Sequence, residues 1–136
     1  MSLLAIKHLY PSKASELLWQ VDVVHGDFPA DKLCIRCKGI WDTGASDSGV
    51  VTGVVNALGL RRLDQPPRPV NTANGVFLSH AYEACLSLSA DYAPLKMTVW
   101  ELPTGDMDVL IGMDIIGLGR FEVDSTSGRT MLTFEI

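Results

Sequence analysis

Hydrophobic residues alternate with polar ones along most of this chain, in short segments that turn-forming residues separate. Alternation with a period of two is typical of β-strands that bury one face. We expect strands at 18–24, 33–41, 81–89, 95–102, 108–112, 120–123 and 130–136. Turn residues recur at a spacing of about 8–12 residues, as they do in β-sandwiches and β-barrels. The pattern therefore predicts a mostly β fold.

Two segments carry a helical pattern instead. In the first, apolar residues recur at helical spacing, and a glycine follows them where a helix C-cap lies. These residues are Val50, Val51, Val54, Val55 and Leu58, followed by Gly59. The second segment, 114–118, has room for about one helical turn. We expect one short helix near Val50–Leu58 and a single helical turn after residue 113.

The dipeptide Asn74-Gly75 is the strongest short hairpin signal in the sequence. Both residues tolerate the positive φ angles that a two-residue hairpin turn requires. Strand-forming residues flank the dipeptide within 70–78. We predict a β-hairpin with Asn74 and Gly75 at its turn.

Length and charge narrow the class of protein. The chain has 136 residues, enough for one compact domain with one core. Its 11 basic and 16 acidic side chains give a net charge of −5, so we expect no nucleic-acid partner, which would require a basic face. No apolar run reaches the roughly 18 residues that span a bilayer, and residues 1–7 lack a signal-peptide pattern. We expect no membrane span, and a soluble, cytoplasmic location is favoured.

The cysteines are Cys34, Cys37 and Cys85, an odd number that makes a poor disulfide framework. Cys34 and Cys37 have the C-x-x-C spacing of redox and zinc sites, but they lie on a predicted strand. Residues three apart on a strand point to opposite faces, which suits a tetrahedral metal poorly. No second cysteine pair or nearby histidine pair completes a ligand set. We expect reduced structural cysteines, no metal site and no cofactor.

One motif stands out for its chemistry. The apolar residues Ile40 and Trp41 lead into Asp42-Thr43-Gly44. A carboxylate in a tight loop at the end of a buried strand is held in a defined, partly desolvated position. Gly44 lets the backbone approach closely and offers an N–H donor, and the Thr43 hydroxyl can lock the loop. The tripeptide is also compatible with an ordinary β-turn in which the aspartate bonds its own backbone.

The order of the motifs resembles one protein family. Asp-Thr-Gly-Ala-Ser at 42–46 is followed by the Asn-Gly hairpin, by Leu-Ile-Gly-Met-Asp at 110–114 and by a terminal pair of strands. This order resembles the retropepsin-like aspartic proteases, in particular their single-domain bacterial and cellular members. The resemblance covers residues 33–136. Residues 1–32 match no motif, and we expect them to belong to the same domain, as an added strand that blocks or builds the cleft.

The resemblance implies a closed β-barrel-like acid protease fold with one or two short helices. It also implies an aspartic endopeptidase in which a homodimer brings together one catalytic aspartate from each copy. The implied catalytic residues are Asp42, Thr43 and Gly44. The implied binding residues for a peptide or protein substrate are Ala45, Ser46 and Asp47, with Ala73, Asn74 and Gly75 at the tip of a flap. Ser46 and Asp47 either line the substrate cleft or cap the loop internally. Leu110–Gly112 would cross behind the catalytic loop, and Met131–Ile136 would interleave with the partner subunit.

The implied mechanism follows from the physics of paired carboxyl groups. Two such groups a few ångströms apart cannot both ionise cheaply, so they share a proton. The ionised group activates a water molecule and the protonated group polarises the scissile carbonyl, without a metal or a covalent intermediate. Ala45 cannot donate the hydrogen bond that a hydroxyl residue gives there in pepsin-like enzymes, so we expect a less acidic activity optimum. The rival hypothesis is a catalytically silent module that keeps the fold and binds peptides or dimerises without cutting.

Other charged residues receive structural interpretations. Asp114, at the start of the second helical segment, is predicted to cap it. Asp106 and Asp108 are predicted to be solvated turn residues. Arg61 and Arg62 are expected at the exit of the first helix, where cations interact favourably with the helix dipole. The histidines, which pair with no serine or cysteine nucleophile in the sequence, are His8, His25 and His80.

Overall fold

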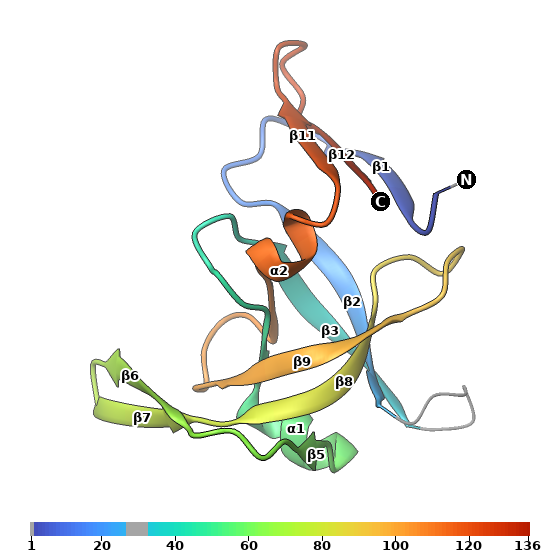
Figure 1. Ribbon diagram of the computed structural model, residues 1–136. Coiled ribbons are helices and arrows are strands. Elements are labelled where there is room, and N and C mark those ends of the chain that lie inside the picture. Colours follow the sequence, from blue (N-terminus) through green and yellow to red (C-terminus); the bar gives the residue numbers. More distant parts are fainter. Residues whose placement is uncertain (1, 27–32) are drawn as a thin grey trace.

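A computed structural model of the chain describes residues 2–26 and 33–136, so most of the turn expected at 26–32 lies outside the described residues. Twelve strands and two helices follow one another along these residues (Figure 1). The strands are β1 Ala5–Leu9, β2 Leu18–His25, β3 Cys34–Trp41, β4 Gly49–Val51, β5 Arg61–Arg62, β6 Arg68–Thr72, β7 Gly75–Ser79, β8 Ala81–Ser87, β9 Leu95–Leu102, β10 Val109–Ile111, β11 Arg120–Asp124 and β12 Met131–Glu135. The helices are α1 Thr52–Leu58 and α2 Met113–Ile116. Each strand that the alternation predicted is confirmed, with small shifts at the ends.

The largest sheet closes on itself. Its strand order is β2-β3-β10-β4-β9-β8-β5, and β2 also pairs with β8. The extra pairing joins the six strands from β2 to β8 into a barrel, with β5 attached to β8. Two of the pairings, β3 with β10 and β4 with β9, are parallel. The parallel β3–β10 pair places the ends of two strands side by side at residues 41 and 111, where the candidate loop begins.

The core lies inside this barrel. Val21 and Val23 of β2 alternate with more exposed neighbours, as the period-two pattern predicted. They are fully buried, as are Val50, Val99 and Ile111 from three other strands. Burial of each such side chain contributes about 1.5–3 kcal/mol to stability.

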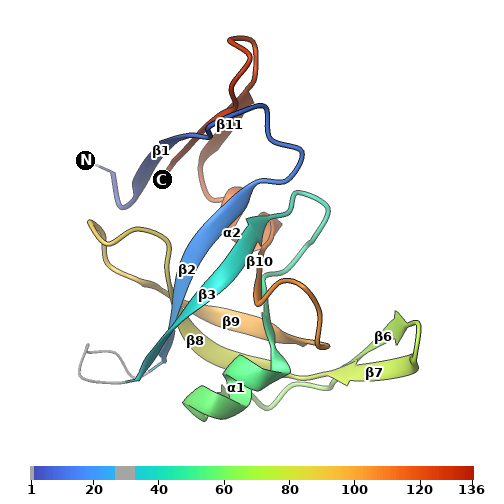
Figure 2. The same cartoon turned by 180° about the vertical axis from the view of Figure 1, so that it is seen from behind.

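A second, smaller sheet has the order β1-β12-β11 (Figures 1 and 2). An added strand was expected within residues 1–32 without a position; β1 is at 5–9, pairs antiparallel with β12, and buries its Ile6. Strand β12 therefore has its own chain on both sides. The expectation that Met131–Ile136 interleave with a partner subunit is wrong for this chain, because no edge of β12 is left open.

The first helix begins later than its apolar pattern predicted. Val50 and Val51 belong to strand β4, and α1 starts at Thr52. Gly59 caps the helix in the left-handed conformation (φ 58°), as predicted. Arg61 and Arg62 form strand β5 instead of extending the helix exit, and Arg61 pairs with Glu83 on β8 at 3.0 Å. In the part of the chain that the structure describes, no helix has the length and apolar character needed to cross a membrane.

Strands β6 and β7 form a hairpin that projects from the barrel as a separate two-stranded sheet (Figures 1 and 2). Its turn lies one residue earlier than predicted: Thr72 pairs with Gly75, and Ala73 and Asn74 form the loop between them. The Thr72 hydroxyl donates to Gly75 O (2.7 Å) and accepts from Asn74 N (3.2 Å). Gly75 alone among these residues has a positive φ, of 108°. The threonine side chain thus stabilises a turn that does not require a left-handed asparagine.

The cysteines of strand β3 point to opposite faces, as predicted: Cys34 is exposed and Cys37 is buried. Burial raises the pKa of the Cys37 thiol to about 12, with further contributions from Asp108 and Asp22. Burial and then Asp22 also raise the pKa of Cys34, although Arg36 acts in the opposite direction. Cys85 is buried as well.

We expect iodoacetamide at pH 8 to alkylate the folded protein at Cys34 alone, and slowly. The raised pKa leaves little thiolate on Cys34, and almost none on the shielded Cys37. Mass spectrometry of the native protein should show one adduct, and three should appear after denaturation. Rapid modification of Cys37 in the native state would contradict this packing of β3.

Candidate active site

The candidate loop begins where β3 ends. Trp41 pairs with Ile111 of β10, and Asp42 N donates to Ile111 O at 2.9 Å. The loop then turns back on itself: Gly44 N donates to Asp42 Oδ1 at 2.9 Å, and Ala45 N donates to Asp42 O at 3.2 Å. Asp42 is half-buried and uses Oδ1 for this turn, while Oδ2 has no hydrogen-bond partner among the described residues. One carboxylate oxygen therefore orients the side chain, and the other is available for chemistry.

The segment that follows β10 supports this loop from behind. Met113 N donates to Ala45 O at 2.8 Å, and Asp114 N donates to Ser46 O at 3.1 Å. Gly112 lies so close to the loop that a Cβ there would stand 2.7 Å from the carbonyl carbon of Asp47 and 2.9 Å from Ala45 O. The two sequence motifs, at 42–46 and 110–114, are thus in direct backbone contact, and only glycine fits at residue 112.

A buried hydrogen-bond network ties the same segments together. Ser48 is fully buried, its Oγ donates to Asp114 Oδ1 (2.6 Å), and its N donates to Asp114 Oδ2 (2.8 Å). Ser48 Oγ also accepts from Gly112 N at 3.0 Å. The prediction that Asp114 caps α2 is wrong: Gly112 is the N-cap residue, and the Asp114 side chain bonds mainly to Ser48. The sequence analysis missed Ser48. The only hint in the sequence is that this small polar residue directly precedes the run Gly49–Val51.

Ser48→Ala is expected to lower the free energy of unfolding by about 1–3 kcal/mol, because it leaves the buried N–H of Gly112 without an acceptor and removes the hydroxyl hydrogen bond to Asp114 Oδ1. Urea denaturation measures the change. Ser46→Ala is the matched control, since Ser46 is exposed and its hydroxyl makes no hydrogen bond within the described residues. A control loss as large as that of Ser48→Ala would show that the network is not the cause.

The remaining candidate residues of this loop face outward. Thr43 and Gly44 are exposed, and the Thr43 hydroxyl bonds to no other residue in the described ranges 2–26 and 33–136. Asp47 points toward the base of the β6–β7 hairpin, where Arg68 Nη1 lies 2.5 Å from its Oδ2. The Arg68 guanidinium also lies 3.6 Å above the centre of the Trp100 ring. Asp47 thus links the loop to the hairpin, and sequence reasoning missed Arg68.

Two hollows flank the hairpin. One of about 550 Å³ lies at its base and is lined by Asp47, Arg68 and Trp100, among others. The other, of about 620 Å³, lies at its tip and includes Ala73 and Asn74. Asp42, Thr43 and Gly44 line neither hollow. The structure brings Asp47 to the hairpin but does not place Asp42 and the hairpin tip in one enclosed site.

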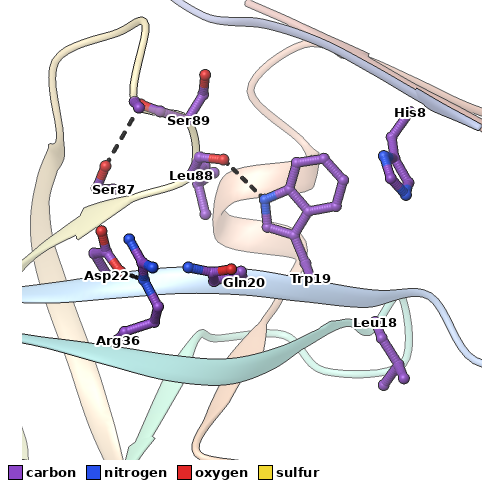
Figure 3. Close-up of a pocket in the computed structure, with 10 residues that line it drawn as sticks. His8, Leu18, Trp19, Gln20, Asp22, Arg36, Ser87, Leu88 and Ser89 are labelled. Atoms are coloured by element: carbon purple, nitrogen blue, oxygen red, sulfur yellow. Dashed lines mark hydrogen bonds and ion pairs between the residues drawn. The ribbon is translucent and has the colours of Figure 1, made fainter.

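A further hollow of about 320 Å³ lies away from these residues, between β1, β2 and the 87–90 loop (Figure 3). Trp19 lines it, with its Nε1 donating to Leu88 O at 2.8 Å, and His8 stands edge-on to the Trp19 ring. It contains none of the predicted site residues.

Asp108, predicted to be a solvated turn residue, instead accepts a hydrogen bond from Lys38 N at 2.9 Å and so fastens β10 to β3. Asp106 is exposed, as predicted.

Comparison with known proteins adds a decisive observation. No family model matches the chain, and no curated protein matches it in sequence. Among solved structures, a retropepsin-like aspartic protease from Rickettsia conorii superposes with a TM-score of 0.60 and 17% identity, over 97% of this chain and 93% of that one. The chain has the retropepsin fold. The protease of EIAV, solved with the inhibitor HBY-793, is also similar, with a TM-score of 0.53 and 16% identity, over 76% of this chain and 86% of that one.

The likeness confirms the predicted acid protease fold, a closed β-barrel with two short helices. The Rickettsia protein matches almost the whole length of the chain, including the part before residue 33 for which the sequence offered no motif. Within this fold the Asp42 loop is the strongest candidate for a reactive site. It holds a carboxylate at the end of β3, where backbone hydrogen bonds fix the loop.

Proposed function

We propose that the chain is one subunit of an aspartic endopeptidase. In this proposal Asp42 supplies half of a catalytic pair, Gly44 orients its carboxylate, and Thr43 contacts the partner's loop. The observation that carries the proposal is the Asp42 carboxylate, which is fixed through Oδ1 by Gly44 N and open at Oδ2. The retropepsin fold supports it, because the solved proteins that share the fold include aspartic proteases.

The chemistry requires a second carboxylate. A lone ionised aspartate can act as a base but cannot also polarise the carbonyl that the water attacks. Two Asp42 residues facing each other would share one proton, so one takes a proton from the water while the other donates to the carbonyl oxygen. As the C–N bond breaks, the aspartic acid that took the proton from water gives it to the leaving amine, and the other carboxylate takes back a proton from the gem-diol, which restores the singly protonated pair. The chain has a single Asp-Thr-Gly sequence, so the second carboxylate would come from another copy in a homodimer.

The substrate would be a peptide in extended conformation, lying between the loop and the hairpin. Ala45, Ser46 and Asp47 would bind it from one side. Ala73, Asn74 and Gly75 would cover it from the other, as the tip of a flap. The hairpin exposes apolar side chains suited to such contacts, since Val76 and Leu78 are 65% and 54% exposed. Closure of the flap would exclude water and add strand-type hydrogen bonds.

We also propose that residues 33–136 are the retropepsin-like domain and that the N-terminal segment belongs to it. Strand β1 pairs with β12, and β2 pairs with both β3 and β8. Removal of β2 would open the barrel, and removal of β1 would expose the edge of β12. The described part of the segment therefore contributes a strand to each of the two larger sheets.

A catalytically silent peptide-binding module is the second candidate function. The exposed Val76 and Leu78 favour it, because they can hold a peptide whether or not it is cut. The test is digestion of a peptide library by the purified protein from pH 3 to 8, read by mass spectrometry. Cleavage products that accumulate with time support the endopeptidase. Peptides that stay bound but intact would favour the silent module.

We expect activity at less acidic pH than in pepsin-like enzymes, because Ala45 offers no hydroxyl to the carboxylate of Asp42. Ala45→Ser supplies that donor, which stabilises the ionised carboxylate and should shift the acidic limb of the pH–rate profile to lower pH. The measurement is the profile of kcat/KM for both proteins on one peptide. A wild-type optimum near pH 2–3 would contradict the expectation.

A further inference from the structure

Among the residues that the structure describes, no strand pairs with the outer edges of the three-stranded sheet, at β1 and at β11. Figure 1 shows these strands on opposite sides of β12, with α2 just below the end at which β11 begins. An open strand edge presents unpaired N–H and C=O groups that can pair with another chain. The proposed function, on which this inference rests, requires a second copy of the chain. The two edges are therefore the places to look for its docking surface.

Hydrogen bonds at the ends of β12 reveal which residues of β11 have unpaired backbone groups. Ile136 and Leu4 exchange hydrogen bonds, and Tyr10 N donates to Thr130 O, so the even-numbered residues of β12 bond to β1. Successive residues of a strand bond to alternate sides, so Met131, Thr133 and Glu135 bond to β11. Their partners on β11 are Asp124, Glu122 and Arg120. The N–H and C=O groups of Phe121 and Val123 therefore point to the open edge.

The two faces of β11 differ in chemistry. On the outer face, Arg120 and Glu122 are exposed, and their side chains pair at 3.0 Å. On the inner face, the Phe121 ring stacks at 5.4 Å from that of Trp41. Val123 is 43% exposed although it also lies on this inner face, beside the open edge. A partner strand paired with β11 would cover Val123 on the inner face. On the outer face it would place its own charged side chains opposite Arg120 and Glu122.

One register of antiparallel pairing between two β11 strands covers the apolar inner face and also sets opposite charges against each other on the outer face. A two-fold axis through Phe121 lets this residue exchange hydrogen bonds with the partner's Phe121, and Gly119 with the partner's Val123. Arg120 then faces the partner's Glu122, and the opposite-charge contact occurs twice, in non-hydrogen-bonded pairs whose side chains approach closely. An axis through Glu122 would instead bring two glutamates face to face. Charge complementarity thus selects the register centred on Phe121.

The β1 edge is unsuited to the same role. By the same alternation, Ala5, Lys7 and Leu9 point their backbone groups to the open side. The register that uses all three centres on Lys7 and sets two ammonium groups opposite each other. An edge lysine is one of the devices by which natural sheets prevent such pairing.

We propose that two copies of the chain join through β11, with Phe121 at the two-fold axis and Arg120 paired with the partner's Glu122. The two small sheets then form one continuous sheet of six strands. The same axis passes close to the candidate site, because Phe121 packs on Trp41 and Asp42 is the next residue along the chain. Both aspartate loops would lie on the inner face of the six-stranded sheet, one on each side of the two-fold axis, so the interface would bring them toward each other.

Charge reversal tests this pairing directly. In a dimer of Arg120→Glu chains, each introduced glutamate faces the partner's Glu122, which makes two repulsive contacts. In a dimer of Glu122→Arg chains, each introduced arginine faces the partner's Arg120. We expect each variant to weaken dimerisation at least about tenfold in sedimentation experiments. An equimolar mixture of the two variants restores both opposite-charge contacts between chains, although each chain keeps a like-charge pair within itself. The mixture should dimerise within about threefold of the wild type. Lys7→Glu, which changes net charge as Arg120→Glu does, should leave dimerisation unchanged.

The outcomes separate this inference from the proposed function. Recovery of dimerisation in the mixture supports the β11 interface. If the dimers then cut no peptide, the endopeptidase proposal is wrong but the interface stands. Peptide cleavage by a wild-type dimer that both single variants form equally well would overturn the β11 interface and keep the endopeptidase. A wild-type protein that stays monomeric at high concentration overturns the interface.

Discussion

Asp42→Asn is expected to reduce peptide cleavage by at least about 10²–10⁴-fold while leaving the fold intact. The amide keeps an oxygen that can accept from Gly44 N at the position of Oδ1, so the turn can form as before. It cannot take a proton from water, and it cannot share one with a second carboxyl group. The loss should therefore fall on kcat, and the measurement is kcat and KM for a single cleaved peptide.

Asp106→Asn is the matched control for this substitution. Asp106 is an exposed turn residue with the same chemistry, and its replacement changes the net charge equally. It should retain wild-type activity. If Asp42→Asn cut the peptide as fast as Asp106→Asn, the residue would have no catalytic role and the silent module would become the better function.

Gly112→Ala is expected to lower the free energy of unfolding by about 1–3 kcal/mol and to impair activity at the same time. The backbone angles of Gly112 are ones that alanine adopts readily (φ −94°, ψ −173°), so the cost is steric. The added methyl group would meet backbone atoms of Asp47 and Ala45 at less than 3 Å, and neither can rotate away. Relief requires the loop to shift, which displaces the Asp42 carboxylate. Urea denaturation and a peptide assay on one preparation measure both effects.

Gly53→Ala provides the comparison. Gly53 lies in α1, and a Cβ there would meet no atom within 4 Å. This substitution should stabilise the protein by about 0.5–1 kcal/mol, because alanine loses less backbone entropy in a helix. Equal effects of the two substitutions would show that the close contact behind the loop does not hold it in place.

Local patterns predicted the elements whose cause is local. Local patterns located every barrel strand except β4, whose Val50 and Val51 were assigned to the first helix. Gly59 marked the end of α1 because a left-handed cap favours glycine. The position of Asp42 followed from an apolar strand that ends in a turn-forming tripeptide. The hairpin turn was predicted in the right region but one residue late, because the Thr72 hydroxyl stabilises the earlier turn.

Long-range pairings were beyond the sequence patterns. Strand β1 reads Ala-Ile-Lys-His-Leu, a weak pattern that becomes a strand because β12 offers it an edge. Ser48 and Asp114 lie 66 residues apart, so no spacing rule connects them. The contact of Arg68 with Asp47 and Trp100 likewise depends on how the hairpin returns to the barrel.

The central claim is that one active site needs two Asp42 residues from two chains, and subunit mixing tests it most directly. Wild-type protein at fixed concentration is mixed with a ninefold excess of Asp42→Asn protein and left to exchange subunits, and peptide cleavage is then measured. If both aspartates are required, most wild-type chains are trapped in inactive mixed dimers, and activity should fall to about one tenth. Activity that stays at the level of wild type alone would contradict the shared site.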